Sequence, residues 1–472
     1  MSQKSRSVDP SRSRAFAGQE HAGEELFPRL LLPLLFLGVL MGALDIAIVG
    51  PALPAIRESF DVDESDLSWV FSVFTLFAVI SAVPLARLSD RFGRRRIYVL
   101  SLSVFTTGSL LVALAPSFGL LIAARAVQAL GAGGIFPVAS AVIGDVVPVE
   151  RRGRALGMIG AVFGIAFLLG PLIGGLLLPL GWQSLFLINL PIGLLLILAA
   201  ARVLPDVRRT AGGSLDWAGM LLLAATLVSV AVGFNRITGL SEGSLQALGF
   251  VVVPLAAAAA LAWALARIER SVPDPIIPPV MFASVQMRRI AAVALVAGFV
   301  ESAMVFLPVV AVSGLQVTDA QAAWMMLPLV VALTLVAPLA GIAVDRWNAP
   351  GVIRIGLVTL TSGLLVFAIA PFGLSSFYAA GCLVGAGLAA LLGSPLRHAA
   401  LAAAGPEHRG VGQGLMSLAL HSGQIVGAAA IGAFIAAQPA GQTGFRTAMF
   451  WLACIAAVAV AIRIRQPRPA HS

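Results

Sequence analysis

The most regular feature of this sequence is a succession of apolar runs, each about 20 residues long and separated by short polar segments. An α-helix of this length crosses the hydrocarbon core of a membrane, which is about 30 Å thick. Proline, glycine or charged residues bound each run, as expected for the loops between helices. The pattern predicts fourteen membrane-spanning helices, at 30–54, 66–88, 96–115, 118–146, 153–178, 183–203, 215–234, 246–268, 288–313, 319–344, 350–371, 375–402, 410–437 and 444–465.

The composition agrees with a membrane-embedded chain. Hydrophobic residues make up 59% of the 472 positions and charged residues only 11%, whereas a soluble domain carries about 25% charged residues. The net charge of +9 does not indicate a nucleic-acid partner, because the basic residues form short clusters between apolar runs rather than one continuous stripe. Cys382 and Cys454 both lie inside apolar runs, so we expect small buried side chains and neither a disulfide nor a metal site.

The charges of the loops predict the orientation of the helices. Loops after odd-numbered spans hold only Arg57, Arg236 and Arg446, whereas loops after even-numbered spans are rich in arginine. Positive residues stay on the cytoplasmic side, so both termini are expected there. An even number of spans follows, and fourteen is favoured over twelve.

The chain also repeats itself at an offset of about 256 residues. Residues 148–153 resemble residues 406–410, and Asp90-Arg91 corresponds to Asp345-Arg346. Asp45 in the first span lines up within one residue with Glu301 in the ninth. The repeat predicts two related six-helix bundles with two helices inserted between them, a common construction for transporters.

This pattern divides the chain into five parts. The predicted parts are a disordered cytoplasmic tail at 1–28, a six-helix bundle at 29–203, a linker with two spans at 204–287, a second six-helix bundle at 288–465 and a short tail at 466–472.

The loop after the second span holds a cluster of charges around one glycine. It contains Asp90, Arg91, Gly93 and Arg94, and glycine permits a tight turn there. A plain positively charged loop is the alternative interpretation. The stretch resembles the Gly-x-Leu-x-Asp-Arg-x-Gly-Arg-Arg loop of the major facilitator superfamily, with Ala86 in place of the first glycine. This resemblance implies a cytoplasmic latch in which the loop charges pair with Asp145, stabilising the outward-facing state.

The fourth span carries Arg125 in the middle of apolar residues. An arginine at lipid depth costs at least about 2.5 kcal/mol unless it is paired or faces water, so a functional role is expected. The alternative is an arginine that extends to the outer interface. The sequence around Arg125 resembles the superfamily's Arg-x-x-Gln-Gly-x-Gly element, and the resemblance implies a role in proton coupling.

The fifth span is rich in glycine. Gly160 and Gly164 are four residues apart, a spacing that lets helices approach closely, and Pro171 is expected to bend the helix. An ordinary packing face is the alternative. The run Gly170, Pro171, Gly174 and Gly175 resembles the superfamily's antiporter motif, which implies export rather than import.

Other charged residues at membrane depth complete the candidate site. Asp45 and Arg125 are predicted at similar depth and could pair, while Glu301 and His421 lie within the ninth and thirteenth spans. Buried carboxylates bind protons near neutral pH, and proton relays in transporters consist of such groups. Structural hydrogen bonding is the alternative for Glu301 and His421.

Two further features complete this interpretation. Arg397 and His398 are expected to be interfacial anchors. The Leu-Asp and Leu-Pro pairs of the first span, residues 44–45 and 53–54, resemble the fourteen-helix drug:proton antiporter branch.

Together these features predict an all-α membrane protein of two major-facilitator bundles and two additional central helices. The expected function is proton-driven efflux of small lipophilic or cationic compounds by a monomer in the plasma (inner) membrane. Its expected partners are the substrate, protons and the lipid bilayer, with no cofactor. The alternatives are an exporter of an endogenous lipid, siderophore or metabolite, a membrane-embedded enzyme and a non-transporting sensor. No nucleophile–base set or metal-ligand motif supports an enzyme.

Overall fold

The computed structural model contains only helices among the residues that it describes. These are residues 10–62, 64–205, 216–235, 245–272, 283–317, 319–371, 373–405, 408–436 and 442–462, with the single residues 275, 281 and 464. Ten described helices are long and apolar enough to cross a membrane, and two shorter apolar helices lie at Ala218–Val230 and Gly444–Val460. Helices occupy all fourteen predicted segments, but the number that cross the membrane stays a prediction.

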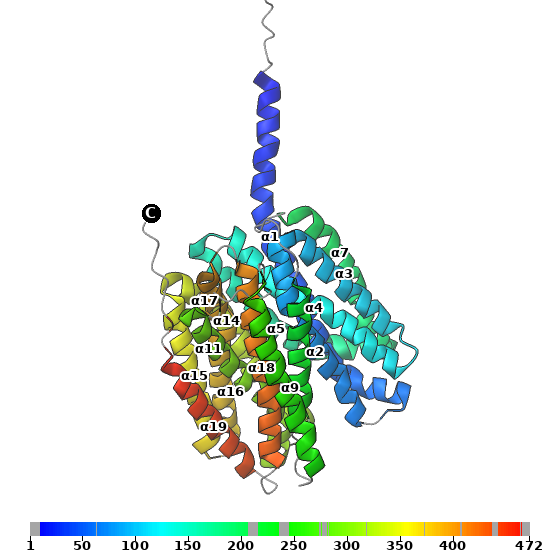
Figure 1. Ribbon diagram of the computed structural model, residues 1–472, viewed down its shortest axis with the longest axis vertical. Helices are drawn as coiled ribbons and strands as arrows, with labels where there is room; N and C mark the ends of the chain where they lie inside the picture. The colour runs from blue at the N-terminus through cyan, green and yellow to red at the C-terminus, as the bar shows by residue number, and fades with distance from the viewer. Residues whose placement is uncertain are drawn as a thin grey trace, which may run out of the picture.

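Residues 10–203 form the N-terminal bundle. Its helices are α1 (Pro10–Phe60), α2 (Glu64–Phe92), α3 (Arg94–Ala113), α4 (Phe118–Val146), α5 (Val149–Leu177), η1 (Leu178–Leu180), α6 (Gln183–Leu187) and α7 (Asn189–Val203). The helix α1 starts at Pro10 and so extends into the predicted disordered tail, projecting beyond the bundle (Figure 1). Proline is favoured in the first turn of a helix, and the alanine, glutamate and arginine residues that follow are strong helix formers.

Residues 285–460 form the C-terminal bundle, and two helices precede it. The two preceding helices are α8 (Trp217–Asn235) and α9 (Leu245–Glu269). The bundle itself consists of α11 (Val285–Ala303), η3 (Met304–Phe306), α12 (Leu307–Leu315), α13 (Asp319–Met325), α14 (Leu327–Arg346), α15 (Ala349–Ile369), α16 (Leu374–Leu392), α17 (Pro395–Ala404), α18 (Arg409–Ala436) and α19 (Gln442–Val460).

Proline accounts for three breaks that the sequence pattern did not predict. Pro308, Pro328 and Pro395 each stand in the first turn of a new helix, α12, α14 and α17. Proline has no N–H to donate to the preceding turn, so a helix readily begins anew there. By contrast, the backbone of α5 stays helical through Pro171.

The two bundles have separate apolar cores and meet along α5 and α18. One core consists of residues between 290 and 464, and another of residues between 31 and 204 with Leu401 added. Between them, α5 packs on α14, and α2 packs on α18. Figure 1 shows α3, α4 and α7 on one side, α11, α15, α16 and α19 on the other, and α5, α9 and α18 between them.

The closeness of α5 to the C-terminal bundle depends on glycine. A Cβ atom on Gly160 would overlap the backbone of Gly393, and one on Gly157 would lie 2.8 Å from the Ala337 carbonyl oxygen. A Cβ on Gly164 would overlap Thr334. The predicted close helix approach at Gly160 and Gly164 is therefore confirmed.

The inserted helices α8 and α9 pack against each other, and α8 covers the line where α2 meets α18. Leu223 and Leu227 of α8 share a buried apolar cluster with Val83 of α2 and Leu415 of α18. The other face of this pair is apolar and exposed, as Phe250 and Trp263 of α9 show. Such a surface suits contact with lipid rather than water.

Candidate functional site

Asp45 is the centre of a polar network inside the N-terminal bundle. Its Oδ2 atom lies 2.6 Å from Nη1 of Arg125, and its Oδ1 atom accepts hydrogen bonds from Gln128 Nε2 at 2.7 Å and Asn189 Nδ2 at 3.1 Å. The side chains of Asp45, Arg125 and Gln128 are 0% exposed. Helices α1, α4 and α7 thus supply one enclosed carboxylate with a charged partner and two amide donors.

The same network supplies some of the hydrogen-bond acceptors that the Arg125 guanidinium requires. Its Nη1 also donates to Gln128 Oε1 at 2.7 Å, and its Nε donates to the Val70 carbonyl oxygen at 3.3 Å. The guanidinium carbon lies 4.1 Å from the ring centroid of Phe74 and 5.7 Å from that of Phe186. These rings exclude water and stabilise the cation. Arg125 therefore does not extend to the outer interface, and the predicted pairing of Asp45 with Arg125 is seen as direct contact.

Three members of this network carried no predicted role. Gln128 lies one helical turn after Arg125, a spacing that places both side chains on one face. Asn189 and Ser109 come from other helices, and Ser109 Oγ accepts from Gln128 at 2.7 Å and from Asn189 at 3.2 Å. Gln128 offered a signal in the sequence through its spacing from Arg125 and through its place in the Arg-x-x-Gln-Gly-x-Gly element.

Glu301 belongs to a second cluster, in the C-terminal bundle. Its Oε2 accepts a hydrogen bond of 2.9 Å from Gln424 Nε2 of α18. His421, one turn earlier on α18, has its Nδ1 2.7 Å from the Ser417 carbonyl oxygen. Arg397 interacts electrostatically with both Glu301 and His421. The two predicted carboxylates therefore have separate partners, one in each bundle.

The position of Arg397 corrects a prediction. It was expected at a membrane interface, but it is 3% exposed, and its guanidinium carbon lies 3.5 Å from the ring centroid of Phe136 in α4. The break before Pro395 makes α17 a separate helix, and α17 packs on α4 of the other bundle. Arg397 is thus placed between the two bundles rather than at a lipid headgroup.

A group of ion pairs joins the two bundles at one end. Arg94 contacts Asp90 at 2.5 Å and Asp145 at 2.9 Å, while Arg409 of the C-terminal bundle contacts Asp145 at 2.8 Å. We call Asp90, Arg94, Asp145 and Arg409 the charged clasp. Gly93, in the turn between α2 and α3, has a φ angle of 102°, which favours glycine.

Backbone groups add to the charged clasp. Asp90 accepts hydrogen bonds of 3.1 Å from the N–H groups of Gly410 and Val411, at the start of α18. In the same way, Asp345 at the end of α14 accepts from Gly153 at 2.7 Å and Arg154 at 2.8 Å, in the first turns of α5. Each bundle therefore places a carboxylate at a helix N-terminus of the other, where negative charge is favoured.

The structure brings together most of the predicted latch. Asp90, Arg94 and Asp145 are in direct contact, and Arg409 is an addition that the sequence did not single out. The guanidinium of Arg91 lies 5.4 Å from the ring centroid of Phe92.

The comparisons with known proteins agree with this architecture. The family model of the Major Facilitator Superfamily matches residues 35–285 and 290–472, nearly the whole chain. The chain belongs to the major facilitator superfamily. It is therefore a multi-pass membrane transporter.

Several members of the superfamily are similar along most of their length. The MFS-type transporter YfiU of Bacillus subtilis is 33% identical over 420 residues, covering 88% of this chain and 81% of YfiU. The multidrug resistance protein Stp of Mycobacterium tuberculosis is 30% identical, covering 85% and 74%. The riboflavin transporter RibZ of Clostridioides difficile is 28% identical, covering 86% and 88%.

A solved structure shows the same fold. The human organic anion transporter MFSD10 superposes with a TM-score of 0.62 at 18% identity, covering 92% of this chain and 99% of MFSD10. At this identity the likeness concerns the fold alone.

The glycine run that resembles the superfamily's antiporter motif lies beside α1. A Cβ atom on Gly170 would lie 3.0 Å from the carbonyl carbon of Ala47, two residues after Asp45. Gly174 is buried, whereas Gly175 is exposed and its Cβ would meet no atom within 4 Å. The Pro171 side chain lies outside the described part. Close packing at Gly170 thus links α5 to the helix that carries Asp45.

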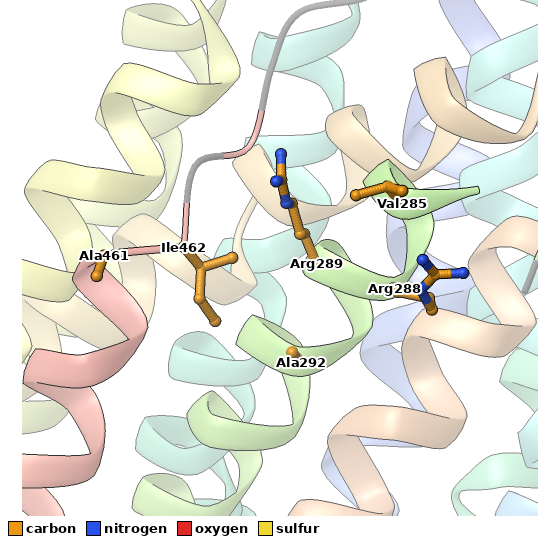
Figure 2. Close-up of a pocket in the computed structure, with 6 residues that line it drawn as sticks. All are labelled: Val285, Arg288, Arg289, Ala292, Ala461 and Ile462. Carbon is orange, nitrogen blue, oxygen red and sulfur yellow. The ribbon is translucent and has the colours of Figure 1, made fainter. Parts of the chain in front are cut away.

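A separate pocket of about 390 Å³ lies at the start of α11 and the end of α19. Arg288 and Arg289 line it together with Val285, Ala292, Ala461 and Ile462 (Figure 2). None of these residues belongs to the Asp45 network, the Glu301 cluster or the charged clasp. We assign no part of the transport site to this pocket.

Proposed function

We propose that this chain exports small lipophilic or cationic compounds in exchange for protons, by alternating access. The observation that carries the proposal is the Asp45 carboxylate, enclosed at lipid depth and held by Arg125, Gln128 and Asn189. An acidic group in such a place is rarely structural alone, because ion pairs at this depth are costly to enclose.

The geometry supports a mechanism for coupling. Protonation of Asp45 removes the negative charge beside Arg125 and leaves an enclosed cation without its partner. Breaking a buried pair in this way costs about 3–5 kcal/mol. A protonated state therefore favours a rearrangement of α1 against α4 that admits water or a new partner to Arg125. Protonation and conformation are thereby linked.

Glu301 offers a second proton site in the C-terminal bundle. The hydrogen bond that Glu301 accepts from Gln424 does not require the charged form, since an amide also bonds a protonated carboxyl. If Glu301 or Asp45 releases a proton when substrate binds, the rate of transport depends on the pH gradient across the membrane. His421 and Arg397 lie close enough to influence Glu301.

The charged clasp supports alternating access. In this structure it closes one end of the molecule through contacts between the bundles, so release of substrate at that end requires its opening. We assign this end to the cytoplasm from the arginine-rich loops, with both termini on the same side. The structure then represents a conformation closed toward the cytoplasm.

The direction of transport rests on the glycine run Gly170–Gly175 and on relatives. The Stp protein is named for multidrug resistance, and another relative of 30% identity is a drug efflux pump, JefA of Mycobacterium tuberculosis. We therefore infer export across the plasma membrane by a monomer of fourteen spans, divided into the five parts predicted above.

Export of an endogenous metabolite is the second candidate, and the similarity to the riboflavin transporter RibZ favours it. Growth of a deletion strain separates the two functions. Loss of resistance to several unrelated drugs supports drug export, whereas unchanged resistance with accumulation of one cellular compound supports metabolite export.

Proteoliposomes test the proposed function directly. The purified chain is reconstituted, and uptake of labelled ethidium and of a panel of lipophilic drugs is followed after an imposed pH jump. We expect uptake that ceases when an ionophore collapses the pH gradient. Uptake of the panel at the same rate with and without the gradient would contradict proton coupling.

A further inference from the structure

Arg397 has an unusual place among the arginines of this molecule. Its side chain is 3% exposed, and the guanidinium stacks on the Phe136 ring of the opposite bundle at 3.5 Å. Phe136 is in turn packed against Phe163 of α5, with ring centroids 5.4 Å apart. The cation thus lies between two bundles, over one ring of an edge-to-face aromatic pair.

Part of the hydrogen-bonding capacity of Arg397 is not used within the described residues. Its Nε and Nη1 atoms are buried and have no hydrogen-bond partner there. Glu301 supplies a compensating negative charge through space, but its carboxylate is hydrogen-bonded to Gln424 instead. A buried guanidinium without acceptors is costly, so its retention calls for an acceptor in another state.

The location of Arg397 indicates when an acceptor could reach it. Phe136 lies nine residues before Asp145 on α4, about 14 Å along the helix axis. Arg397 lies on α17, which leads directly to Arg409. In addition, a Cβ on Gly144 of α4 would lie 2.9 Å from Leu401 of α17. Arg409 lies on α18, and α17 packs on α18. An opening of the charged clasp that separates Asp145 from Arg409 would therefore also move α4 away from α17.

Separation of α4 from α17 would expose the Arg397 guanidinium. The flat face of the guanidinium loses Phe136 and becomes free for another aromatic ring. The same motion uncovers the Nε and Nη1 donors, which favour carboxylate, phenolate or carbonyl oxygens in the plane of the fork. An aromatic molecule with such an oxygen at its edge satisfies both requirements at once.

We propose that Arg397 is a substrate-binding residue that takes flat aromatic compounds bearing an acceptor oxygen when the clasp end of the molecule is open. The proposal rests on the proposed transport function. Of the lipophilic and cationic compounds proposed above, it selects lipophilic compounds with a flat aromatic ring and an acceptor oxygen over cations. Arg397 adds to the two carboxylates a binding group of opposite charge. In the closed state Phe136 occupies the place of the substrate ring, so closure and release are linked.

Binding of two xanthene dyes to the purified full chain tests this proposal. Fluorescein carries carboxylate and phenolate oxygens, whereas rhodamine 6G is a cationic ester of similar shape. Anisotropy at constant pH measures the Kd of each dye for wild type, Arg397→Gln, Arg397→Lys and Asp145→Asn. Arg446→Gln is the matched control, since Arg446 donates to the Ala368 carbonyl oxygen outside the proposed site.

We expect wild type to bind fluorescein more tightly than rhodamine 6G. Arg397→Gln should weaken fluorescein binding by about tenfold or more, with less than about twofold effect on rhodamine 6G. Arg397→Lys keeps the charge but not the fork, so an intermediate loss is expected. Asp145→Asn should strengthen fluorescein binding, and Arg446→Gln should change neither dye.

Three results would overturn the proposal: unchanged fluorescein binding in Arg397→Gln, an equal loss of both dyes, or a wild-type preference for rhodamine 6G. Should Arg397→Gln fail to fold, Arg397→Lys provides the same comparison. Arg397-dependent binding in a protein that shows no gradient-driven uptake would contradict the proposed export function and leave this assignment standing.

Discussion

The charge and hydrogen-bonding requirements of Arg125 account for most of the residues around it. A guanidinium at lipid depth requires an anion and several acceptors. Asp45 supplies the anion, Gln128 an amide oxygen and Val70 a backbone carbonyl oxygen. Phe74 covers the face that has no acceptor. The network therefore holds α1, α2 and α4 in one arrangement as long as Asp45 stays ionised.

Replacement of Gln128 tests this network. Gln128→Leu removes bonds to Asp45, Arg125 and Ser109 and leaves these buried groups with fewer partners. We expect a loss of about 2 kcal/mol or more in stability, measured by thermal or denaturant unfolding in detergent. The control is Ser362→Ala. The exposed Ser362 hydroxyl donates to the Val358 carbonyl oxygen of its own helix, and its loss should cost less than about 0.5 kcal/mol. Equal stability of the two variants would show that the network contributes little.

The sequence predicts the charged part of the site better than its neutral part. A membrane-embedded arginine demands an acid at the same depth, so the pairing of Asp45 with Arg125 follows from their positions in the chain. Asn189 and Ser109 could not be chosen, because neutral polar residues occur on all faces of such helices and their direction depends on helix rotation. Arg397 was misplaced because its predicted span ran through Pro395 without a break.

Among the helices, the contact of α5 with the C-terminal bundle depends on glycine residues. Gly157 faces Gly341, and Gly160 faces Gly393. These contacts place α5 against α14 and α16 as closely as backbones allow. The glycine spacing in α5 predicted this closeness, but not the partner helix, since any small-residue face could serve.

Gly160→Val should separate α5 from Gly393. Two added methyl groups and a Cβ overlap backbone atoms, which must shift, at a cost of about 1–3 kcal/mol. The measurement is the unfolding midpoint together with the rate of drug uptake, and both should fall. Gly249→Ala in α9 is the control, because its Cβ meets no atom within 4 Å and alanine favours helices. A Gly160→Val protein as stable and active as this control would refute the packing argument.

At the scale of the whole molecule, two related bundles hold each other by reciprocal contacts. Asp90 accepts hydrogen bonds from the first turn of α18, and Asp345 accepts them from the second turn of α5, at positions that the internal repeat had aligned. The sequence repeat therefore anticipated equivalent residues, though not that each would reach across to the other bundle. Arg409 joins them because it precedes Gly410 at the start of α18.

Asp145→Asn should open the clasp end of the molecule. Loss of the charge weakens contacts to Arg94 and Arg409 together, so an open conformation gains population. Spin labels at Val149 and Trp347, both exposed and on opposite bundles, measure the opening as a distance by double electron–electron resonance. Cys382 and Cys454 are first replaced so that only the two introduced cysteines carry labels. We expect a longer distance in Asp145→Asn.

Labels at Arg96 and Val149 lie within one bundle and serve as the control for this measurement. Their distance should not change in Asp145→Asn. An unchanged distance for Val149–Trp347 would show that the charged clasp does not hold the closed state.

The proposed coupling depends on carboxylates, enclosed in the helices, that exchange protons for substrate. Its most direct test is drug uptake by proteoliposomes over a series of imposed pH gradients, with Asp45→Asn, Glu301→Gln and the exposed control Glu150→Gln. We predict that Asp45→Asn or Glu301→Gln loses the steep dependence on the gradient while Glu150→Gln keeps it. Uptake by both Asp45→Asn and Glu301→Gln that rises with the gradient as steeply as in wild type would contradict the account.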